Sequence, residues 1–492
     1  MIIAFQPELR PALPTVFGAK DYREFRAALE EMDRILAGTG IEARFIGDRI
    51  KTMGVDLSPR RQQWHYRTLR MALRYSILLG ITQDSHRALS RRVSDSQLFQ
   101  WFTHTSHVDG VRPVSKSTLE RFEKMFPDGA ISQLIHDINR AMRDESVVRE
   151  YLYRESVLRF DEIFADTTCV KADIHFPVDW VLLRDATRTL IKAIMLIRAQ
   201  GIKHRINDPR TFLRKVNKLC IEMTHVRKKP DAKKMRKQIF RRMKALMKVI
   251  EKHATTYHHE LETHWTQTEW SEIETQVVLD RMRNILDQLP RAIHQAHERI
   301  IGERRMANKD KILSLYEHDV HVLVRGKTGA EVEFGNALYL AEQSDGLIVD
   351  WSFIKNQPPG DNKLTTASIE RILHEYDLPA SYATDRGFDS RGNRIDLEEL
   401  GIVNAICPRS VELLQEKLED EDFCRLQKRR AGTEARIGIF KNAYLGAPLR
   451  SKGFKNRRVR IEWCILSHNL WKLACMAAER RKEIKAELAP AV

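Results

Sequence analysis

The sequence lacks any long apolar segment. Its 492 residues contain no run of 18 uninterrupted apolar residues, so we expect no helix that spans a bilayer. The first residues, MIIAFQPE, have neither the basic start nor the apolar stretch of a signal peptide. Cysteine is scarce, and the six that occur form no close pair and no zinc-type spacing. They are predicted to be buried thiols of a reducing compartment, so we expect a cytoplasmic protein with no membrane partner.

Two familiar cofactor motifs are also incomplete. Gly326-Lys327-Thr328 looks like the end of a phosphate-binding loop, but His321 stands where the first glycine of that loop should be. Four histidines lie between residues 253 and 264, yet the position four residues after His259 is Thr263, so the metalloprotease spacing fails. We therefore expect no nucleotide cofactor, and we favour a polar helix face over a zinc site for these histidines.

Positive charge is abundant. Lysine and arginine number 83 against 67 acidic residues, a formal net charge of +16. Such a surplus attracts polyanions, so nucleic acid is the first partner to consider and an anionic membrane the second. Residues 227–252 carry 12 Lys/Arg against Asp231 and Glu251, with apolar residues at helical spacing (Met235, Ile239, Leu246 and Ile250). Most runs of charged residues form a solvated helix face, but the excess of positive over negative charge in this segment favours contact with phosphates.

The chain is too long for one ordinary domain, and the pattern of apolar and polar residues changes along its length. Residues 1–150 are predicted to form a helical domain. Residues 151–190 and 311–480 are predicted to form the two parts of an α/β core with a mixed sheet. A long basic helical insertion (191–310) separates these parts, and residues 481–492 are expected to be a C-terminal tail.

The helical domain contains a pattern compatible with a helix-turn-helix that reads DNA. A helix is expected within residues 84–103, and a second begins after Ser115, a good N-cap. Leu119, Phe122 and Phe126 lie on one face of this second segment, and Lys116, Arg121 and Lys124 point outward. A plain helical bundle is equally compatible with the pattern.

The core begins with residues 157–166, which are predicted to form a buried strand ending at Asp166. Further elements are expected along the second part of the core: strands at 320–324, 337–341 and 347–349 with a hairpin turn at Asp345-Gly346, a helix at 364–376, and strands at 381–384 and 402–406. Antiparallel strands followed by alternating helix and strand predict a mixed sheet.

Three acidic residues stand out by their setting. Asp166 and Asp385 each follow a hydrophobic strand, and ligands gather at the carboxyl ends of strands in such sheets. Glu434 lies in a predicted helix in which Arg430, Glu434 and Lys441 fall within about 20–40° of one line. Taken singly, each aspartate is more commonly a turn or cap residue, and the helix stripe an ordinary ion-pair surface.

Together, three carboxylates suit Mg²⁺, which takes a few carboxylate ligands and keeps waters or phosphate oxygens as the others. Two such ions about 3.5–4 Å apart can activate an attacking oxygen and stabilise a leaving one at phosphorus. No nucleophilic side chain is required, because the nucleophile is water or a DNA 3′-hydroxyl.

At these residues the sequence resembles the DDE-type transposases of bacterial insertion sequences. Three blocks carry the resemblance: FADTTCVKADIHFPVDWVLL (164–183), ATDRGFDSRGN (383–393) and the spacing Arg430-x3-Glu434-x6-Lys441. The tyrosine that precedes the arginine in the family is Gln427 here. The segment Tyr75–Phe126 resembles the helical domain that precedes such cores. The subgroup stays open, with an ISNCY-like one as the candidate.

The resemblance implies an RNase H-like catalytic core in which Asp166, Asp385 and Glu434 bind two Mg²⁺ or Mn²⁺ ions. It implies that DNA is held by basic side chains, for which we name Arg430, Lys441, Lys327, Lys116 and Arg121. The expected reaction is cleavage at the transposon ends, followed by strand transfer of the freed 3′-hydroxyl into target DNA. The expected partners are terminal inverted repeats, target DNA and a second or further copy of the chain, in the nucleoid of a bacterial cytoplasm.

Two rival functions remain. A stand-alone metal-dependent nuclease could use the same core, although it would have little use for a large N-terminal DNA reader. A non-catalytic DNA-binding protein derived from a transposase is the other, but its three acids would be free to drift and all three blocks are intact here.

Overall fold

The computed structural model describes residues 10–53, 58–107, 110–226, 230–327 and 330–488. The chain forms two compact units. The first unit combines the chain up to Lys171 with residues 337–354 and everything from Pro358 onward, and the second combines 172–336 with 355–357. No helix within the described ranges has both the length and the apolar content needed to cross a membrane.

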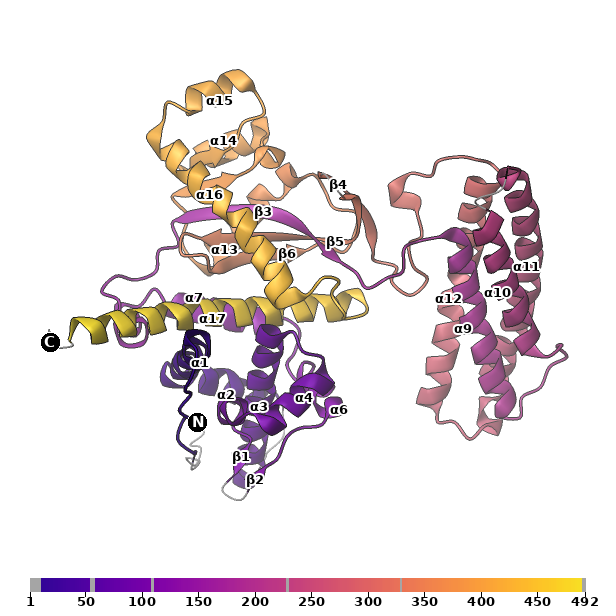
Figure 1. The fold of residues 1–492 in the computed structure, drawn as a ribbon, viewed down its shortest axis with the longest axis horizontal. Coiled ribbons are helices and arrows are strands. Elements are labelled where there is room, and N and C mark those ends of the chain that lie inside the picture. Colours follow the sequence, from indigo (N-terminus) through magenta and orange to yellow (C-terminus); the bar gives the residue numbers. More distant parts are fainter. Residues whose placement is uncertain (1–9, 54–57, 108–109, 227–229, 328–329, 489–492) are drawn as a thin grey trace. The chain divides into compact units, whose positions relative to one another are not determined.

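The N-terminal part of the first unit is helical, as expected. Its elements are α1 (Lys20–Gly38), α2 (Ile41–Thr52), α3 (Pro59–Thr82), α4 (His86–Asp95), α5 (Gln97–Thr103), α6 (Lys116–Phe122), α7 (Ala130–Ala141), α8 (Glu145–Val147) and η1 (Val148–Leu152). Helices α1, α3 and α7 pack against the long α17 (Phe454–Glu487), which supplies the other side of their core (Figure 1).

A buried arginine ties four of these helices together. Arg74 on α3 is fully buried and forms ion pairs with Asp33 of α1 and Glu42 of α2. It also donates a hydrogen bond of 3.0 Å to the carbonyl of Phe102 on α5. Removing one partner of such a group leaves an uncompensated buried charge, so this cluster fixes how the helices meet.

The region expected to hold a helix-turn-helix is more elaborate than its pattern indicates. The segment 84–103 is two helices, interrupted at Ser96, which caps α5. The predicted cap at Ser115 is confirmed, since its Oγ accepts a backbone N–H from three residues further on at 3.3 Å. Between α5 and α6 lies a small antiparallel hairpin of β1 (Ser106–His107) and β2 (Gly110–Val111). Helix α6 therefore follows a hairpin, whereas a simple helix-turn-helix has a turn of three or four residues.

The first unit contains a mixed sheet, as expected. Its strands are β3 (Glu162–Lys171), β5 (Ala330–Gln343, from Ala337 onward in this unit), β6 (Ile348–Phe353), β7 (Ser381–Thr384) and β8 (Val403–Ile406). Their order is β6-β5-β3-β7-β8. The β5–β6 pair is antiparallel, whereas β3–β7 and β7–β8 are parallel.

Helices cover both faces of this sheet. Side chains alternate between faces along a strand, so Phe164 and Ala383 share one face, and they pack with Phe423 and Leu426 of α16 (Glu421–Phe440). Tyr382 points to the other face, in the larger core that includes α13 (Thr365–Glu375) and much of the N-terminal helices. Helix α14 (Arg391–Glu399) lies beside β8.

Two of the boundaries predicted for the first unit are wrong. The strand expected at 157–166 runs from Glu162 to Lys171, so Asp166 lies in its middle and not at its end. The β-branched residues after Asp166 favour continuation of the strand and outweigh the break expected at a charged residue. Residues 481–487, expected in the tail, continue α17.

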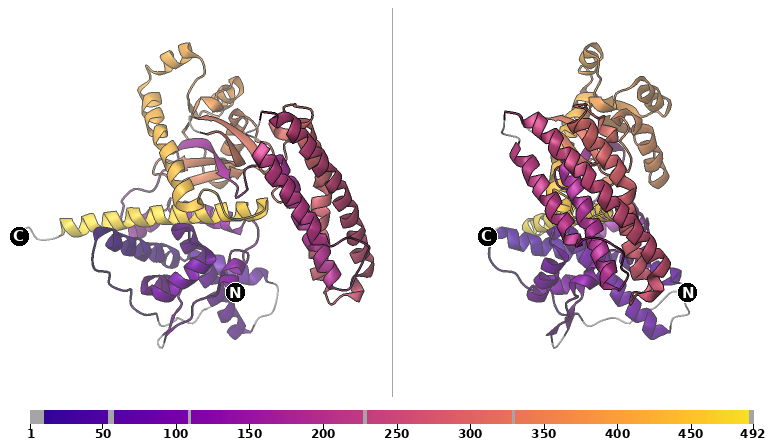
Figure 2. Two further views of the ribbon diagram at one scale, coloured as in Figure 1. Left: turned by 45° about the vertical axis from the view of Figure 1, so that its right-hand side comes forward. Right: turned by 90° about the vertical axis from the view of Figure 1, so that its right-hand side faces the viewer.

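The second unit is a helical bundle with its own apolar core. Helices α9 (Asp179–Ala199), α10 (Pro209–His225), α11 (Ala232–His264) and α12 (Glu272–Ile300) run side by side (Figures 1 and 2). The bundle begins at Asp179, earlier than residue 191 expected for the insertion. The unit also contains β4 (His321–Lys327), paired antiparallel with the first part of β5.

Candidate active site

The register of two neighbouring strands brings Asp166 and Asp385 to the same level. Parallel strands β3 and β7 pair Ile163 with Tyr382 and Phe164 with Ala383. Continuing that register by two residues sets Asp385, directly after β7, opposite Asp166. Residues two apart point to the same face of a sheet, so both carboxylates lie on the face covered by α16. Two acids 219 positions apart in sequence thus become neighbours.

Each aspartate is oriented by a backbone N–H. The Oδ1 of Asp166 accepts the N–H of Thr167 at 2.7 Å, and the Oδ1 of Asp385 accepts the N–H of Gly387 at 2.8 Å. The Asp166 side chain is 17% exposed and that of Asp385 is 40% exposed. The first is therefore held inside the fold, whereas the second borders solvent. This combination gives a site that is preorganised and still reachable.

Arg430 of α16 lies between the two carboxylates. Its Nη2 is 3.7 Å from Oδ2 of Asp166 and 3.9 Å from Oδ2 of Asp385. The two carboxylate oxygens are therefore at most about 7.6 Å apart, the sum of these distances. Among the described residues, the buried Nε of Arg430 has no hydrogen-bond acceptor. One positive charge thus offsets two negative ones at this site.

Helix α16 is fixed over this site by contacts of two residues that precede Arg430. Gln427 donates to the backbone carbonyls of Thr384 and Ala405, at the ends of β7 and β8. Arg429 forms an ion pair of 3.1 Å with Glu342 of β5 and stacks over the ring of Phe164 at 4.4 Å. Gln427 occupies the position where the related motif has tyrosine, and here its amide holds the helix to the sheet.

A further carboxylate, Asp361, borders the site. It begins the short helix η5 (Asp361–Lys363), and its Oδ1 accepts a hydrogen bond of 2.9 Å from the hydroxyl of Thr167, the neighbour of Asp166. A Cβ added to Gly387 would be 3.0 Å from Oδ2 of Asp361 and 3.0 Å from Oδ1 of Asp385. Gly387 therefore separates two carboxylates, and the lack of a side chain there lets both approach.

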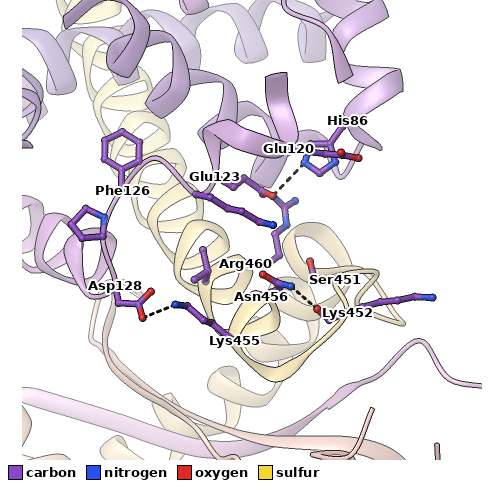
Figure 3. A pocket seen from close by; sticks show the side chains of 13 residues that line it. His86, Glu120, Glu123, Phe126, Asp128, Ser451, Lys452, Lys455, Asn456 and Arg460 are labelled. Atoms are coloured by element: carbon purple, nitrogen blue, oxygen red, sulfur yellow. Dashed lines mark hydrogen bonds and ion pairs between the residues drawn. The ribbon is translucent and has the colours of Figure 1, made fainter. Parts of the chain in front are cut away.

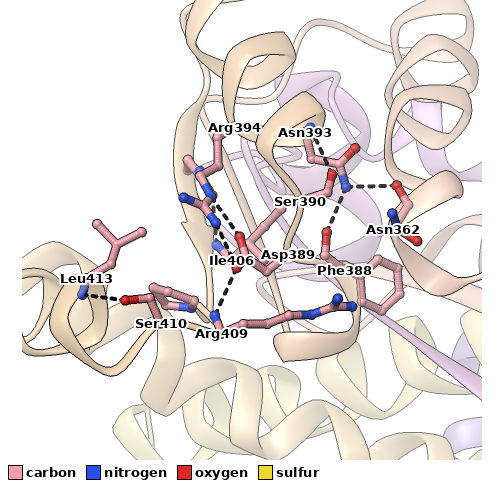
Figure 4. A network of polar contacts seen from close by, with 12 residues as sticks. Asn362, Phe388, Asp389, Ser390, Asn393, Arg394, Ile406, Arg409, Ser410 and Leu413 are labelled. Atoms are coloured by element: carbon pink, nitrogen blue, oxygen red, sulfur yellow. Dashed lines mark hydrogen bonds and ion pairs between the residues drawn. The ribbon is translucent and has the colours of Figure 1, made fainter.

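A buried asparagine holds the segments that carry Asp361 and Asp385 (Figure 4). The Nδ2 of Asn393 donates to the carbonyl of Asn362 at 2.9 Å and to the carbonyl of Phe388 at 2.7 Å. Asn362 belongs to η5, and Phe388 ends the short helix η6 (Arg386–Phe388) after Asp385. One amide thus fixes the spacing between the two loops.

Arg409 and Asp389 fix the far side of the Asp385 loop (Figure 4). The guanidinium of Arg409 donates to the carbonyls of Arg386 at 2.9 Å and Gly387 at 3.0 Å. Asp389 accepts two hydrogen bonds from Arg394 and one from the backbone N–H of Arg409. Burial alone would raise the pKa of Asp389, but these hydrogen bonds and the nearby positive charges lower it below its ordinary value. The network therefore stays charged and intact at neutral pH.

Glu434 lies one turn after Arg430 on α16 and is exposed. Lys441 closes α16 and opens the π-helical turn η7 (Lys441–Leu445). Among the described residues, no group of three or more His, Cys, Asp and Glu has the arrangement of a metal site. The aspartate pair nevertheless offers the hard oxygen ligands that Mg²⁺ takes, with a cationic group already between them. Two of the three predicted ligands are thus brought together by the β3–β7 register, and Glu434 lies on the helix that covers the same face of the sheet.

The other predicted DNA-contact residues lie elsewhere. Lys116 and Arg121 are exposed on α6, where Lys116 forms an ion pair of 2.9 Å with Glu120 and Arg121 bonds to Ser117 of its own helix. Lys327 ends β4 in the second unit, and its side chain lies outside the described residues.

A separate pocket of about 870 Å³ opens between α6 and the start of α17 (Figure 3). None of the three predicted carboxylates lines it. Its charges largely pair with one another: Glu123 contacts His86 at 3.3 Å and Arg460 at 3.0 Å, and Asp128 contacts Lys455 at 3.2 Å. These pairs join the N-terminal helices to α17.

Sequence reasoning missed Asp361, Gln427 and Asn393. Asp361 follows Pro358-Pro359-Gly360, a signal for a turn and not for a ligand. The tyrosine-to-glutamine departure at Gln427 drew attention to that position but did not indicate its contacts.

Comparison of the chain with protein-family models, with curated proteins and with solved structures gives no match.

Proposed function

We propose that this chain is a DNA transposase that cuts DNA at transposon ends and joins the freed 3′-hydroxyl to target DNA. One observation carries the proposal. Asp166 and Asp385 meet on adjacent parallel strands, on one face, beneath a helix that bears Arg430 and Glu434. Acids so far apart in sequence are brought together by the sheet itself, as a phosphoryl-transfer centre requires.

The sheet supports the assignment of an RNase H-like core to the first unit. The strand that carries Asp166 lies inside a mixed sheet, with an antiparallel pair on one side and two parallel strands on the other. Asp385 directly follows the next strand, and the helix of the third acid follows the last one. This order of acids along the topology agrees with that expected from the three sequence blocks.

Asp166, Asp385 and Glu434 would hold two Mg²⁺ or Mn²⁺ ions, which activate the attacking oxygen and stabilise the leaving oxygen at phosphorus. The chain orients the carboxylates, because the backbone N–H groups of Thr167 and Gly387 fix one oxygen of each aspartate. Arg430, which lies near these acids, would bind a phosphate oxygen of the DNA.

DNA recognition is proposed for further basic residues. Lys441 and Lys327 would bind the transposon end, and Lys116 and Arg121 on the exposed side of α6 would contact terminal-repeat DNA. Joining requires two ends in one complex, so we propose an assembly of at least two copies. A bacterial cytoplasm is the proposed compartment.

The test incubates the purified full chain with labelled terminal-repeat duplex and Mg²⁺ or Mn²⁺, and measures cleaved and joined products. Asp166→Ala, Asp385→Ala and Glu434→Ala are each expected to reduce both products by about 10³-fold or more, because a ligand of the proposed metal centre is lost. The matched control is Asp377→Ala, an exposed acid paired with Arg143, which should leave both products unchanged.

The outcomes separate the alternatives. Cleavage without joining would identify a nuclease, and binding without cleavage a non-catalytic DNA-binding protein. Full activity of Asp166→Ala together with Asp385→Ala would overturn the proposal. Activity of Glu434→Ala alone would reassign the third ligand, and Asp361→Ala would then be compared with it.

A further inference from the structure

Seven of the nine lysines and arginines of helix α11 fall into two classes, and the other two are Arg236, which lies over the ring of Trp180, and the half-buried Lys244. Three form ion pairs with acids of neighbouring segments: Lys233 and Lys237 with Glu303 at 3.2 and 2.8 Å, and Arg242 with Glu222 at 2.8 Å. Four others, namely Lys234, Arg241, Lys248 and Lys252, are exposed and form no ion pair with any described residue. The difference between the classes lies in where each residue falls around the helix.

The four unpaired cations form one straight stripe. At 100° per residue, they lie within about 40° of a single line along α11. The buried residues Met243, Met247 and Ile250 point to the opposite side, into the bundle core. We define the α11 stripe as Lys234, Arg241, Lys248 and Lys252. It faces solvent over about 18 residues, a length of about 27 Å at 1.5 Å per residue.

No acid interrupts the stripe. The acidic residues of α11 are Glu251, Glu260 and Glu262, and helical geometry places each about 80–100° from the stripe line. Near the stripe line, the exposed non-acidic positions include Ala245 between the cations, and Thr255 and His259 beyond Lys252. A solvated helix that needed charge only for solubility would alternate signs to gain pairs one turn apart. Here the positive groups remain aligned and unneutralised.

We infer that the α11 stripe is a second DNA-binding surface, which holds the phosphate backbone of duplex DNA without reading its sequence. Duplex DNA carries one negative charge per about 1.7 Å of axis, so a length of 27 Å presents about 16 phosphates to four cations. Lysine and arginine bind phosphates by charge, and their alignment along one exposed helix face suits contact with successive phosphates of the backbone. This surface shares its partner class with the proposed function but needs none of the carboxylate chemistry.

The test measures binding of the full chain to a random-sequence duplex of 30 base pairs between 50 and 200 mM salt. The stripe variant carries Lys234→Gln, Arg241→Gln, Lys248→Gln and Lys252→Gln. Each phosphate contact contributes about 0.9 to the slope of log affinity against log salt, so the slope should fall by about 3.6. Across this fourfold change in salt, wild-type binding should therefore weaken about 10²-fold more than binding by the variant.

A matched control removes the same charge from the same bundle. Lys233→Gln, Lys237→Gln and Arg242→Gln, with Arg214→Gln whose partner is Asp208, neutralise four paired cations. Their slope should change by less than about 1, because these side chains already contact acids. Equal slopes for the two variants would overturn the inference and leave net charge as the explanation. Loss of binding to anionic vesicles with DNA binding intact would overturn it as well, in favour of a membrane surface.

Failure of this inference can be told apart from failure of the proposed function. Asp166→Ala should keep the full salt slope while losing cleavage and joining, because the four stripe cations are unchanged in that variant. The stripe variant should unfold at the same temperature as wild type, since its four positions are exposed.

Discussion

The carboxylate site and the α11 stripe use charge in opposite ways. At the site, each charged group is fixed: Asp166 by the N–H of Thr167, Asp385 by that of Gly387, and Arg430 between them. On the stripe, four cations are exposed and form no ion pair with any residue that the structure describes. Fixed charges can act on a single phosphorus atom, whereas free ones create an attraction that salt screens. The two regions therefore suit chemistry and capture, respectively.

The largest expected effect would test whether the two regions are energetically separate. Met247 is fully buried in the bundle core, and Met247→Ala should lower the free energy of unfolding of the second unit by about 2–5 kcal/mol through the cavity it leaves. Hydrogen exchange followed by mass spectrometry should show faster exchange in α9–α12 and unchanged exchange in β3 and β7. Equal loss of protection in both regions would show that the units unfold together.

Gly387→Ala should have a nearly equal effect in free energy, but on the activation barrier of the reaction at the carboxylate site. Its new Cβ would lie 3.0 Å from oxygens of both Asp361 and Asp385, so one carboxylate must move. A displacement of about 1 Å at a reacting centre lowers the rate about 10²-fold, measured here as DNA cleavage per folded molecule. Gly392→Ala is the control: its Cβ meets nothing nearer than 4.0 Å, and in α14 it should leave cleavage intact and raise stability by up to about 1 kcal/mol.

Glu462 is a buried acid whose negative charge is only weakly offset by a nearby cation, so it contrasts with the closely paired acids of the carboxylate site. Burial, helped by the charge of Asp128 and opposed by Arg458, raises the pKa of Glu462 to about 7. The folded chain therefore keeps this proton while the unfolded chain has released it, and stability falls as pH rises from about 4.5 to about 7.

Glu462→Gln removes that ionisation. We expect the variant to be more stable than wild type by about 2 kcal/mol at pH 8 and equally stable at pH 4, measured by urea unfolding at both values. A stability difference that does not change between the two pH values would show that ionisation of Glu462 is not its cause.

The smallest effect concerns paired cations. Arg242→Gln breaks an ion pair whose side chains are 59% and 30% exposed, so the free energy of unfolding should fall by less than about 1 kcal/mol. Arg394→Gln, which removes both hydrogen bonds to the buried Asp389, should cost more, about 2 kcal/mol. Equal losses in thermal unfolding would mean that the network at the site is no more tightly held than the bundle surface.

Sequence patterns were sufficient for the elements but not for their contacts. The strand at 381–384, the turn at Asp345-Gly346 and the helix around Glu434 all occur where local pattern predicts them. Local pattern works there because alternation, turn residues and helical spacing are properties of short segments. The end of β3 was misplaced because strand propensity beyond Asp166 outweighed the charge.

The site could be predicted only in part for the same reason. Asp166 and Asp385 were chosen from their place near strands, and the β3–β7 register then brings them together. Asp361 and Asn393 act through tertiary contacts between segments that have no local signature, so no single-sequence pattern points to them. Whether Glu434 joins the aspartates depends on a side-chain orientation at an exposed position, which spacing along a helix does not determine.

The packing of α17 has a consequence for synthesis. Ser467 of α17 donates to the carbonyl of Ile77 on α3, and the ring of Trp463 packs edge-on against that of Phe126. The N-terminal helices thus obtain one wall of their core from residues made more than 300 positions later. While the ribosome is still producing the bundle and the sheet, these helices have an open apolar side. A nascent chain should therefore need protection from aggregation until α17 emerges.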